Sequence, residues 1–195
     1  SATESYDVNT LGIIKVKLSG NHPQEGTTAL DNDIKEALQL ADPYINFAFF
    51  DTKNADGNIS SDELQILCIV AGGDRTYGDI NQSILAKSDT FDNNLTLDGV
   101  NIAYKNGGGN FSVVGELQNN NPFTIGLVAK MLAKNALNFT LQGDNYTFND
   151  FDLMGDGYNG YENTDANGTM PVHPSVYNKI KQGWTTPIIL KKNRT

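Results

Sequence analysis

Cysteine, basic residues and long apolar runs are all scarce in this 195-residue sequence. The single cysteine, Cys68, cannot form a disulfide within the chain, so packing or bound ions must stabilise the fold. No apolar stretch approaches the roughly 20 residues that a membrane-spanning helix needs. Acidic residues (23) outnumber basic ones (14), and the net charge of -9 disfavours the basic surfaces that nucleic acids and anionic membranes select. We therefore expect neither nucleic acid nor membrane as a partner.

The residues that are present indicate a compact chain. Hydrophobic residues make up 38% of the sequence and nine are phenylalanine, which argues against disorder. We find no repeat and no linker, and predict one domain over residues 1–195. Cys68 lies in an apolar run and is expected to be a small buried hydrophobic residue. No signal-peptide pattern opens the chain, and we interpret residues 1–5 as a boundary inside a longer secreted protein.

Apolar residues at helical spacing predict three helices. These helices cover residues 30–40, 123–137 and 175–182. In the first helix, Asp31, Asn32 and Asp33 are expected in the opening turn, where acidic side chains interact favourably with the helix dipole. The helix over residues 123–137 has the clearest pattern of the three.

Alternating or continuous apolar residues predict four strands. These strands cover residues 12–18, 66–71, 96–104 and 112–117. The run at residues 66–71 is apolar throughout, so we expect that strand to be buried on both faces. Glycines at residues 106–110 predict a turn, and residues 143–169 are predicted to form a long ordered loop. Helices and strands together indicate an α+β fold.

Two segments near the C-terminus carry a family resemblance. Residues 151–157 read F-D-L-M-G-D-G, and residues 171–187 contain a K-x-x-x-G-W pattern. Together they resemble the methionine-turn region of the immune-inhibitor-A family of secreted zinc metallopeptidases. The resemblance implies a zincin-like fold with a small mixed sheet, a central helix and a loop-rich C-terminal part. It also implies that Asp152, Met154 and Gly155 form the methionine turn.

Further segments match this family in the same order along the chain. Residues 50–57 correspond to an F-D-x-x-x-D-G segment of the family, with an inserted residue. Residues 69–73 follow it and correspond to a strand that ends in A-G. Residues 124–126 stand where the family enters its zinc-binding helix. Because each piece is short, the order and spacing of the pieces carry the resemblance.

The zinc-binding motif of the family is missing from this chain. In the family, an H-E-x-x-H helix supplies two histidines that bind zinc and a glutamate that acts as general base. Leu127, Val128 and Met131 stand at those three positions. The chain has only two histidines, His22 and His173, and neither lies on this helix. A zinc peptidase needs such ligands and a base, so zinc is not expected and the chain is interpreted as a pseudopeptidase.

Residues near the turn could line a cleft. Tyr158 and Tyr161 are expected to be exposed aromatic residues that suit a ligand-contacting rim, although solvated loop tyrosines are the alternative. His173 stands before the final helix, as a family histidine often does, or is simply a polar residue near that helix. A second hypothesis is an active secreted hydrolase or metallopeptidase with a non-standard site around His173 and the turn at residues 152–156.

Residues 52–63 match the spacing of an EF-hand calcium loop at several positions. The candidate ligands are Asp51, Asn54, Asp56, Asn58 and Glu63. Thr52 occupies the first position and Asp51 stands one residue early, so an inserted residue could alter or abolish calcium binding. A calcium loop outside an EF-hand and a plain turn both remain open. A weaker second candidate is the acidic loop with Asp144, Asp152, Asp156, Glu162 and Asp165.

Two classes of function follow from these patterns. The first is a non-catalytic binding or structural module of a secreted, bacterial protein, with a peptide, a glycan or another domain of the parent protein as partner. The second is the hydrolase with a non-standard site. The sequence displays no nucleophile or activated water for that hydrolase, so we favour the binding or structural module.

Overall fold

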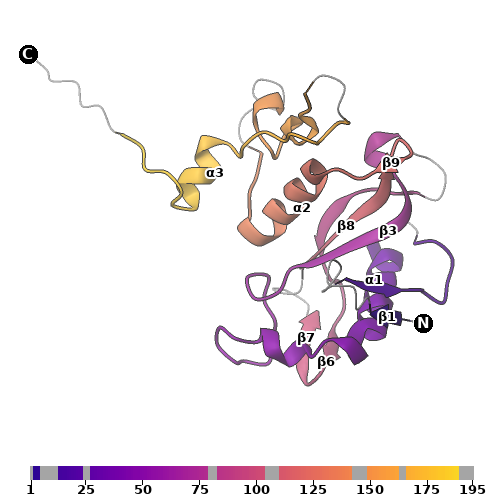
Figure 1. Cartoon of the computed structure of the whole chain (residues 1–195). Coiled ribbons are helices and arrows are strands. Elements are labelled where there is room, and N and C mark those ends of the chain that lie inside the picture. Colours follow the sequence, from indigo (N-terminus) through magenta and orange to yellow (C-terminus); the bar gives the residue numbers. More distant parts are fainter. Residues whose placement is uncertain are drawn as a thin grey trace, which may run out of the picture. The chain divides into compact units, whose positions relative to one another are not determined.

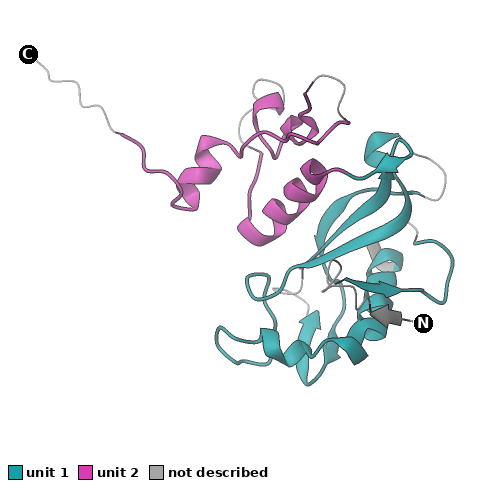
Figure 2. Ribbon diagram, viewed as in Figure 1, with its two compact units in different colours: residues 1–123 teal, residues 124–195 magenta. Residues whose placement is uncertain are grey.

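The computed structural model describes residues 2–4, 13–23, 27–78, 83–103, 110–141, 149–162 and 166–188 (Figure 1). The chain forms two compact units, Ser1–Phe123 and Thr124–Thr195, which we call unit 1 and unit 2 (Figure 2). The class is α+β, as the sequence predicts, with a small mixed sheet and few helices. The single domain over residues 1–195 stays a prediction.

Unit 1 holds the strands and one long helix. Its helices are α1 (Thr27–Ala41) and the 3-10 helices η1 (Asp42–Tyr44), η2 (Phe47–Phe50) and η3 (Arg75–Tyr77). Its strands are β1 (Ala2–Glu4), β2 (Ile14–Val16), β3 (Ile66–Asp74), β4 (Ser83–Ile84), β5 (Lys87–Thr90), β6 (Leu95–Leu97), β7 (Val100–Ala103), β8 (Asn110–Gln118) and β9 (Asn121–Pro122). The main sheet has the order β4-β3-β8-β5, and β9 also pairs with β8. It is mixed, because β3 runs parallel to β4 and β8 whereas β5 runs antiparallel to β8.

Helix α1 confirms the first predicted helix. Leu30, Ile34 and Leu38 recur at helical spacing and are all buried in the core of unit 1. The helix begins at Thr27, so the placement of Asp31, Asn32 and Asp33 in its first turn is wrong. Asp31 is instead buried one turn further on, where its carboxylate accepts a hydrogen bond of 2.6 Å from the Lys35 ammonium.

Strand β3 confirms the strand predicted at residues 66–71, but burial on both faces is wrong. Ile69 is 47% exposed, while Cys68 and Val70 pack against the core. Among the described strands, continuous burial is found in β8, where Phe111 to Gly115 are all buried. Burial raises the pKa of the Cys68 thiol to about 12, which keeps the thiol protonated and unreactive.

The strand predicted at residues 96–104 is a hairpin. Strands β6 and β7 pair antiparallel, and Asp98 and Gly99 form the turn between them with φ of 51° and 82°. An Asp-Gly pair suits a two-residue hairpin turn because both central residues need positive φ. Strand β8 confirms the strand at residues 112–117, and β2 confirms a shorter strand than residues 12–18. The turn at residues 106–110 lies outside the described residues except for Asn110.

Unit 2 holds the two remaining predicted helices, α2 (Ile125–Leu137) and α3 (Val176–Lys181), and both are confirmed. Two 3-10 helices, η4 (Asn149–Phe151) and η5 (Gly157–Asn159), lie in the described part of the predicted loop. The Ser175 hydroxyl caps α3 by accepting a hydrogen bond of 3.4 Å from the Asn178 backbone N–H. Among the described residues of both units, no helix has the length and apolar character required to cross a membrane.

Candidate functional site

The turn predicted from the family resemblance is built on a buried aspartate. Asp152, Met154 and Gly155 are all buried. One side-chain oxygen of Asp152, Oδ1, accepts hydrogen bonds of 3.1 Å from the backbone N–H groups of Met154 and Ser175. The Gly155 N–H donates to the Asp152 carbonyl at 2.9 Å. Asp152 therefore fixes the turn and joins it to the start of α3.

Helix α2 presents apolar side chains at the three positions where the resemblance places zinc ligands. Leu127 is 1% exposed and Met131 is 8% exposed, and Val128 is half-buried. Leu127 and Met131 lie one turn apart, so they share one face of the helix. The hydrocarbon side chains of Leu127 and Val128 carry no atom that can bind a metal. This face of α2 is part of the packed interior.

Lys130 joins α2 to the turn. Its Nζ donates a hydrogen bond of 2.7 Å to the Gly155 carbonyl and lies 4.1 Å from the centre of the Tyr158 ring. Burial lowers the pKa of the Lys130 ammonium, and the carboxylates of Asp156 and Asp152 oppose this shift. Lys130 is not among the site residues predicted from the sequence. Its signal was a lysine placed between apolar neighbours, Ala129 and Met131, although nothing local indicates its partner 25 residues away.

The aromatic rim predicted for the loop is only partly correct. Tyr158 is 7% exposed, so its predicted exposure is wrong: its ring lies under the Lys130 ammonium. Tyr161 is exposed, as is Phe151, a residue that the sequence analysis did not single out. The described part of this loop therefore presents Phe151 and Tyr161, not Tyr158 and Tyr161, to solvent.

The second hypothesis places a histidine–carboxylate site at His173 and the turn over residues 152–156. His173 is exposed, and its carbonyl accepts a hydrogen bond of 3.2 Å from the Leu153 N–H, which brings its backbone beside the turn. Within the described residues, the His173 ring makes no hydrogen bond to Asp152 or Asp156. Asp156 bonds to the Asn149 amide instead. Asp152 keeps one buried oxygen, Oδ2, without a partner among the described residues.

The calcium-like loop is ordered by its own hydrogen bonds. Asp51 Oδ2 accepts from the Gly57 N–H at 2.9 Å, and its other oxygen, Oδ1, is buried without a partner among the described residues. Asp56 accepts from the Asn58 N–H and from the Asn54 amide, each at 2.8 Å. Four of the five candidate ligands, Asp51, Asn54, Asp56 and Asn58, thus take part in hydrogen bonds within residues 51–58.

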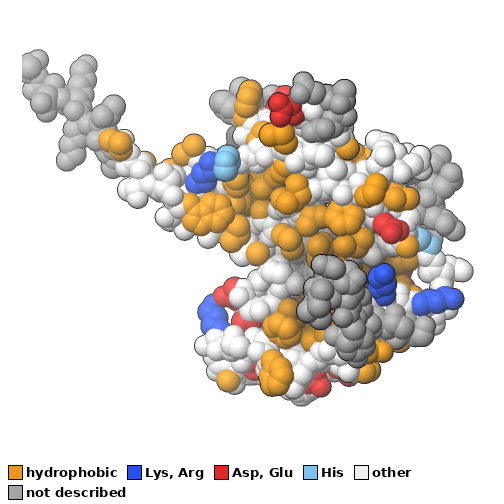
Figure 3. Space-filling view, viewed as in Figure 1, with side chains coloured by type: hydrophobic (Ala, Val, Ile, Leu, Met, Phe, Trp, Pro, Cys, Tyr) orange, Lys and Arg blue, Asp and Glu red, His pale blue; other side chains and the backbone are white. Residues whose placement is uncertain are grey.

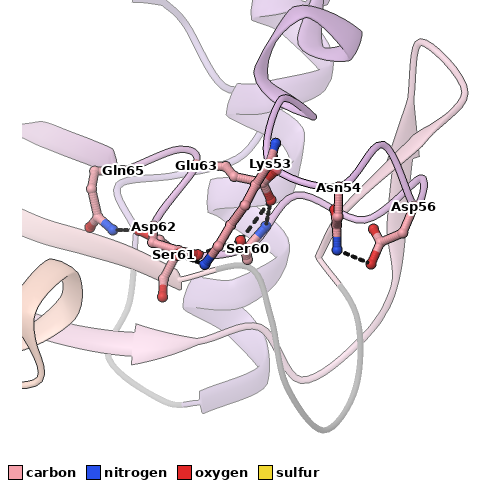
Figure 4. Close-up of polar contacts among 8 residues, drawn as sticks. All are labelled: Lys53, Asn54, Asp56, Ser60, Ser61, Asp62, Glu63 and Gln65. Atoms are coloured by element: carbon pink, nitrogen blue, oxygen red, sulfur yellow. Dashed lines mark hydrogen bonds and ion pairs between the residues drawn. The ribbon is translucent and has the colours of Figure 1, made fainter.

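Glu63, the fifth candidate ligand, is engaged elsewhere. Its oxygens accept from the backbone N–H groups of Lys53 and Ser60, each at 2.9 Å, and from the Ser60 hydroxyl at 2.6 Å. These bonds with Ser60 are the main reason why the pKa of Glu63 is lowered. In Figure 4, Glu63 points toward Ser60, apart from the bonded pair Asn54 and Asp56. Glu63 therefore caps the loop, because its carboxylate binds the backbone N–H groups of both Lys53 and Ser60.

No set of metal ligands is assembled in the part of the chain that the structure describes, counting groups of three or more His, Cys, Asp and Glu. Of the weaker acidic-loop candidates, Asp152 is buried in the turn and Asp156 and Glu162 are exposed. Asp144 and Asp165 lie outside the described residues.

Comparisons with known proteins add no relative, because no family model, curated protein or solved structure matches this chain. The resemblance to immune-inhibitor-A peptidases therefore stays a prediction from sequence motifs.

Proposed function

We propose that this chain is a zincin-like, catalytically inactive relative of immune-inhibitor-A peptidases that serves as a binding or structural module of a secreted bacterial protein. The observation that carries this proposal is the link from Lys130 on α2 to the Gly155 carbonyl of the turn. In a zinc peptidase of this type, the metal lies above the methionine turn and is bound by the helix. Here a protein ammonium connects the two elements.

Lys130 also makes the helix face unfavourable for zinc. A half-buried ammonium repels a second cation nearby, because charges interact strongly where water is excluded. Leu127 and Met131 fill the positions of the missing imidazoles with buried apolar groups. On this proposal, the hydrogen bond from Lys130 to the Gly155 carbonyl joins the helix to the turn where the family has its metal.

The exposed aromatics of the loop support a binding role. Phe151 is 77% exposed and Tyr161 is 58% exposed. Aromatic side chains give large contact areas with little loss of conformational entropy, so they suit contacts with a peptide, a glycan or a neighbouring domain. We assign no residue a role in bond cleavage.

A broad peptide-library digest tests the absence of activity. We expect no cleavage above the level of a matched preparation lacking the protein, with zinc added or with chelator. Cleavage that the chelator abolishes would overturn the proposal. Chelator-resistant cleavage that His173→Ala removes would instead establish the non-standard hydrolase.

A further inference from the structure

Helix α3 is attached to the end of α2 by polar side chains. Asn178 is fully buried, and its amide donates a hydrogen bond to the Thr140 carbonyl at 2.9 Å. The Gln182 amide donates to the Leu137 carbonyl at 2.7 Å. Carbonyls near a helix C-terminus need such donors, because the helix itself supplies none. The polar side of α3 is therefore fixed against the rest of unit 2.

The apolar side chains on and directly after α3 face solvent. We define the α3 face as four residues with exposed fractions of 65%, 53%, 39% and 58%, namely Val176, Tyr177, Ile180 and Trp184. Trp184 is held edge-on against the buried Phe139 ring, with ring centres 5.4 Å apart. Figure 3 shows hydrophobic side chains gathered on the part of unit 2 that contains α3. A helix normally turns its apolar side inward, so this arrangement marks an interaction surface.

The sequence around the α3 face is basic. All 23 acidic residues of the chain lie in residues 1–165, whereas residues 166–195 contain five lysine or arginine residues and no acidic one. Lys179 and Lys181 belong to α3 itself. The Lys181 ammonium donates to the Asn138 carbonyl at 3.2 Å, and this neutral acceptor does not cancel its positive charge. The exposed apolar residues and the lysines are thus carried by the same short helix.

The net charge of -9 taken alone predicts no anionic membrane as a partner, but the position of the charges changes that expectation. At physiological ionic strength, electrostatic interactions between exposed charges fade over about 8 Å. A partner that touches the α3 face therefore interacts mainly with the charges near that face. Lysine side chains close to an anionic bilayer are attracted to its surface. The charge of α3 is complementary to that of such a bilayer.

The side chains of the α3 face suit the boundary between lipid headgroups and acyl chains. Tryptophan and tyrosine are enriched at this boundary, because each combines an apolar ring with a polar group. Val176 and Ile180 add apolar area. A lysine can keep its stem on apolar surface while its ammonium extends to the headgroups. Apolar burial and electrostatic attraction add in binding of this kind, and α3 offers both.

We propose that the α3 face docks on anionic lipid bilayers, with Tyr177 and Trp184 among the headgroups and the two lysines of α3 beside lipid phosphates. The contact is peripheral, because α3 has six residues whereas a membrane-spanning helix needs roughly 20. This inference goes beyond the proposed binding module and does not depend on it. It uses neither the turn at residues 152–155 nor the helix positions of the missing zinc ligands.

Fluorescence of the full chain tests the proposal, because Trp184 is its only tryptophan. Phosphatidylcholine vesicles that contain phosphatidylglycerol should shift the Trp184 emission to shorter wavelength, and brominated acyl chains should quench it. Vesicles of phosphatidylcholine alone should bind about tenfold more weakly or less, and added salt should weaken binding to the anionic vesicles. Unchanged emission together with no co-sedimentation with vesicles would overturn the proposal, as would equal binding to both kinds of vesicle.

Two matched pairs of variants assign the binding to the α3 face. Lys179→Glu should weaken vesicle binding about tenfold or more, whereas Lys15→Glu, the same charge change at an exposed lysine of unit 1, should have a much smaller effect. Tyr177→Asp should also weaken binding, whereas Phe49→Asp at an exposed aromatic residue of unit 1 should not. Equal effects within either pair would contradict the proposal. Circular dichroism checks that each variant is folded.

Sedimentation velocity without lipid distinguishes this contact from self-association. We expect the wild-type chain to stay monomeric at the protein concentrations of the vesicle assay. Concentration-dependent assembly that Tyr177→Asp abolishes, in a chain that binds no vesicles, would contradict the proposal in favour of a protein partner for the α3 face.

Discussion

At the scale of single residues, unit 2 depends on two residues of α2 with specific neighbours. Lys130 reaches the turn through its ammonium, and Gly126 lets the start of the helix approach the loop. Neither role could be predicted from the sequence, because the partners are 25 or more residues away and no local pattern names them. The burial of Tyr158 could not be predicted for the same reason: a tyrosine in a glycine-rich loop gives no sign that a distant lysine covers its ring.

Lys130→Met should destabilise the protein by roughly 1–3 kcal/mol, because it removes a charge-assisted hydrogen bond and leaves the Gly155 carbonyl without its donor. Urea denaturation measures the free energy of unfolding. Lys134→Met is the control, since Lys134 lies on the same helix and is exposed. Equal stability of the two variants would contradict the proposed link.

Gly126→Ala should also be destabilising, although alanine favours helices by about 1 kcal/mol over glycine. A Cβ at this position would lie 1.9 Å from the Tyr158 carbonyl oxygen and 2.9 Å from the Gly168 Cα. Relieving such overlap costs roughly 1–3 kcal/mol. The matched control is Gly20→Ala, where a Cβ meets no atom within 4 Å. A stabilised Gly126→Ala protein would show that the helix start is loosely packed.

At the scale of elements, the spacing of apolar residues predicted the helices whose apolar side is distinct. The helices at α1, α2 and α3 were predictable because each repeats apolar residues on one side. The hairpin of β6 and β7 was missed although Asp98 and Gly99 are a strong turn signal, because the apolar residues on both sides read as one strand. The uneven burial of β3 was not predictable, since a continuous apolar run does not show which face of the strand is covered by the rest of the fold.

The loop at residues 51–63 is predicted to bind calcium through Asp51 and Asp56 rather than Glu63. Asp51 has a buried oxygen without a partner among the described residues. Asp56 is exposed and bonds to Asn54 and Asn58 of the same turn, whereas half-buried Glu63 bonds to Lys53 and Ser60 outside that turn. Calcium at a hundredfold excess over its dissociation constant should stabilise the fold by about 2.7 kcal/mol.

Thermal melts with calcium and with excess chelator measure this stabilisation. Asp51→Ala and Asp56→Ala should abolish the calcium-dependent shift, while Glu63→Gln and the exposed control Glu116→Gln should retain it. A midpoint that calcium leaves unchanged in the wild-type protein would mean that the loop is only a turn.

The capping role of Glu63 has a pH signature. Its pKa is lowered in the folded protein from the ordinary 4.5, so its contribution to stability is present above that value and is lost as pH falls through the lower, folded pKa. The stability difference between wild type and Glu63→Gln should therefore shrink toward zero as pH falls below about 4.5. A difference that stays constant down to acid unfolding would show that the carboxylate charge is not involved.

At the scale of the whole molecule, the distribution of charged residues and of exposed apolar residues differs along the chain. Most acidic residues lie in residues 1–123, whereas α3 combines lysines with exposed apolar residues. The net charge was predictable from composition, but the inverted orientation of α3 was not. It depends on Asn178 and Gln182 finding backbone partners at residues 137–140. A sequence pattern identifies the apolar and the polar side of a helix, but it does not show which side packs against the rest of the protein.

The central claim is that α2 and its turn retain the frame of a zinc peptidase with the metal site replaced. Calorimetric zinc titration tests it most directly, with three folded proteins compared. The first is wild type, the second is Leu127→His/Val128→Glu/Met131→His, and the third carries the same motif one residue later, as Val128→His/Ala129→Glu/Leu132→His; both variants also carry Lys130→Met to remove the repelling ammonium. We predict no stoichiometric zinc in wild type and tighter zinc binding in the second protein than in the third. Stoichiometric zinc in wild type, or equal binding by the two variants, would contradict the account.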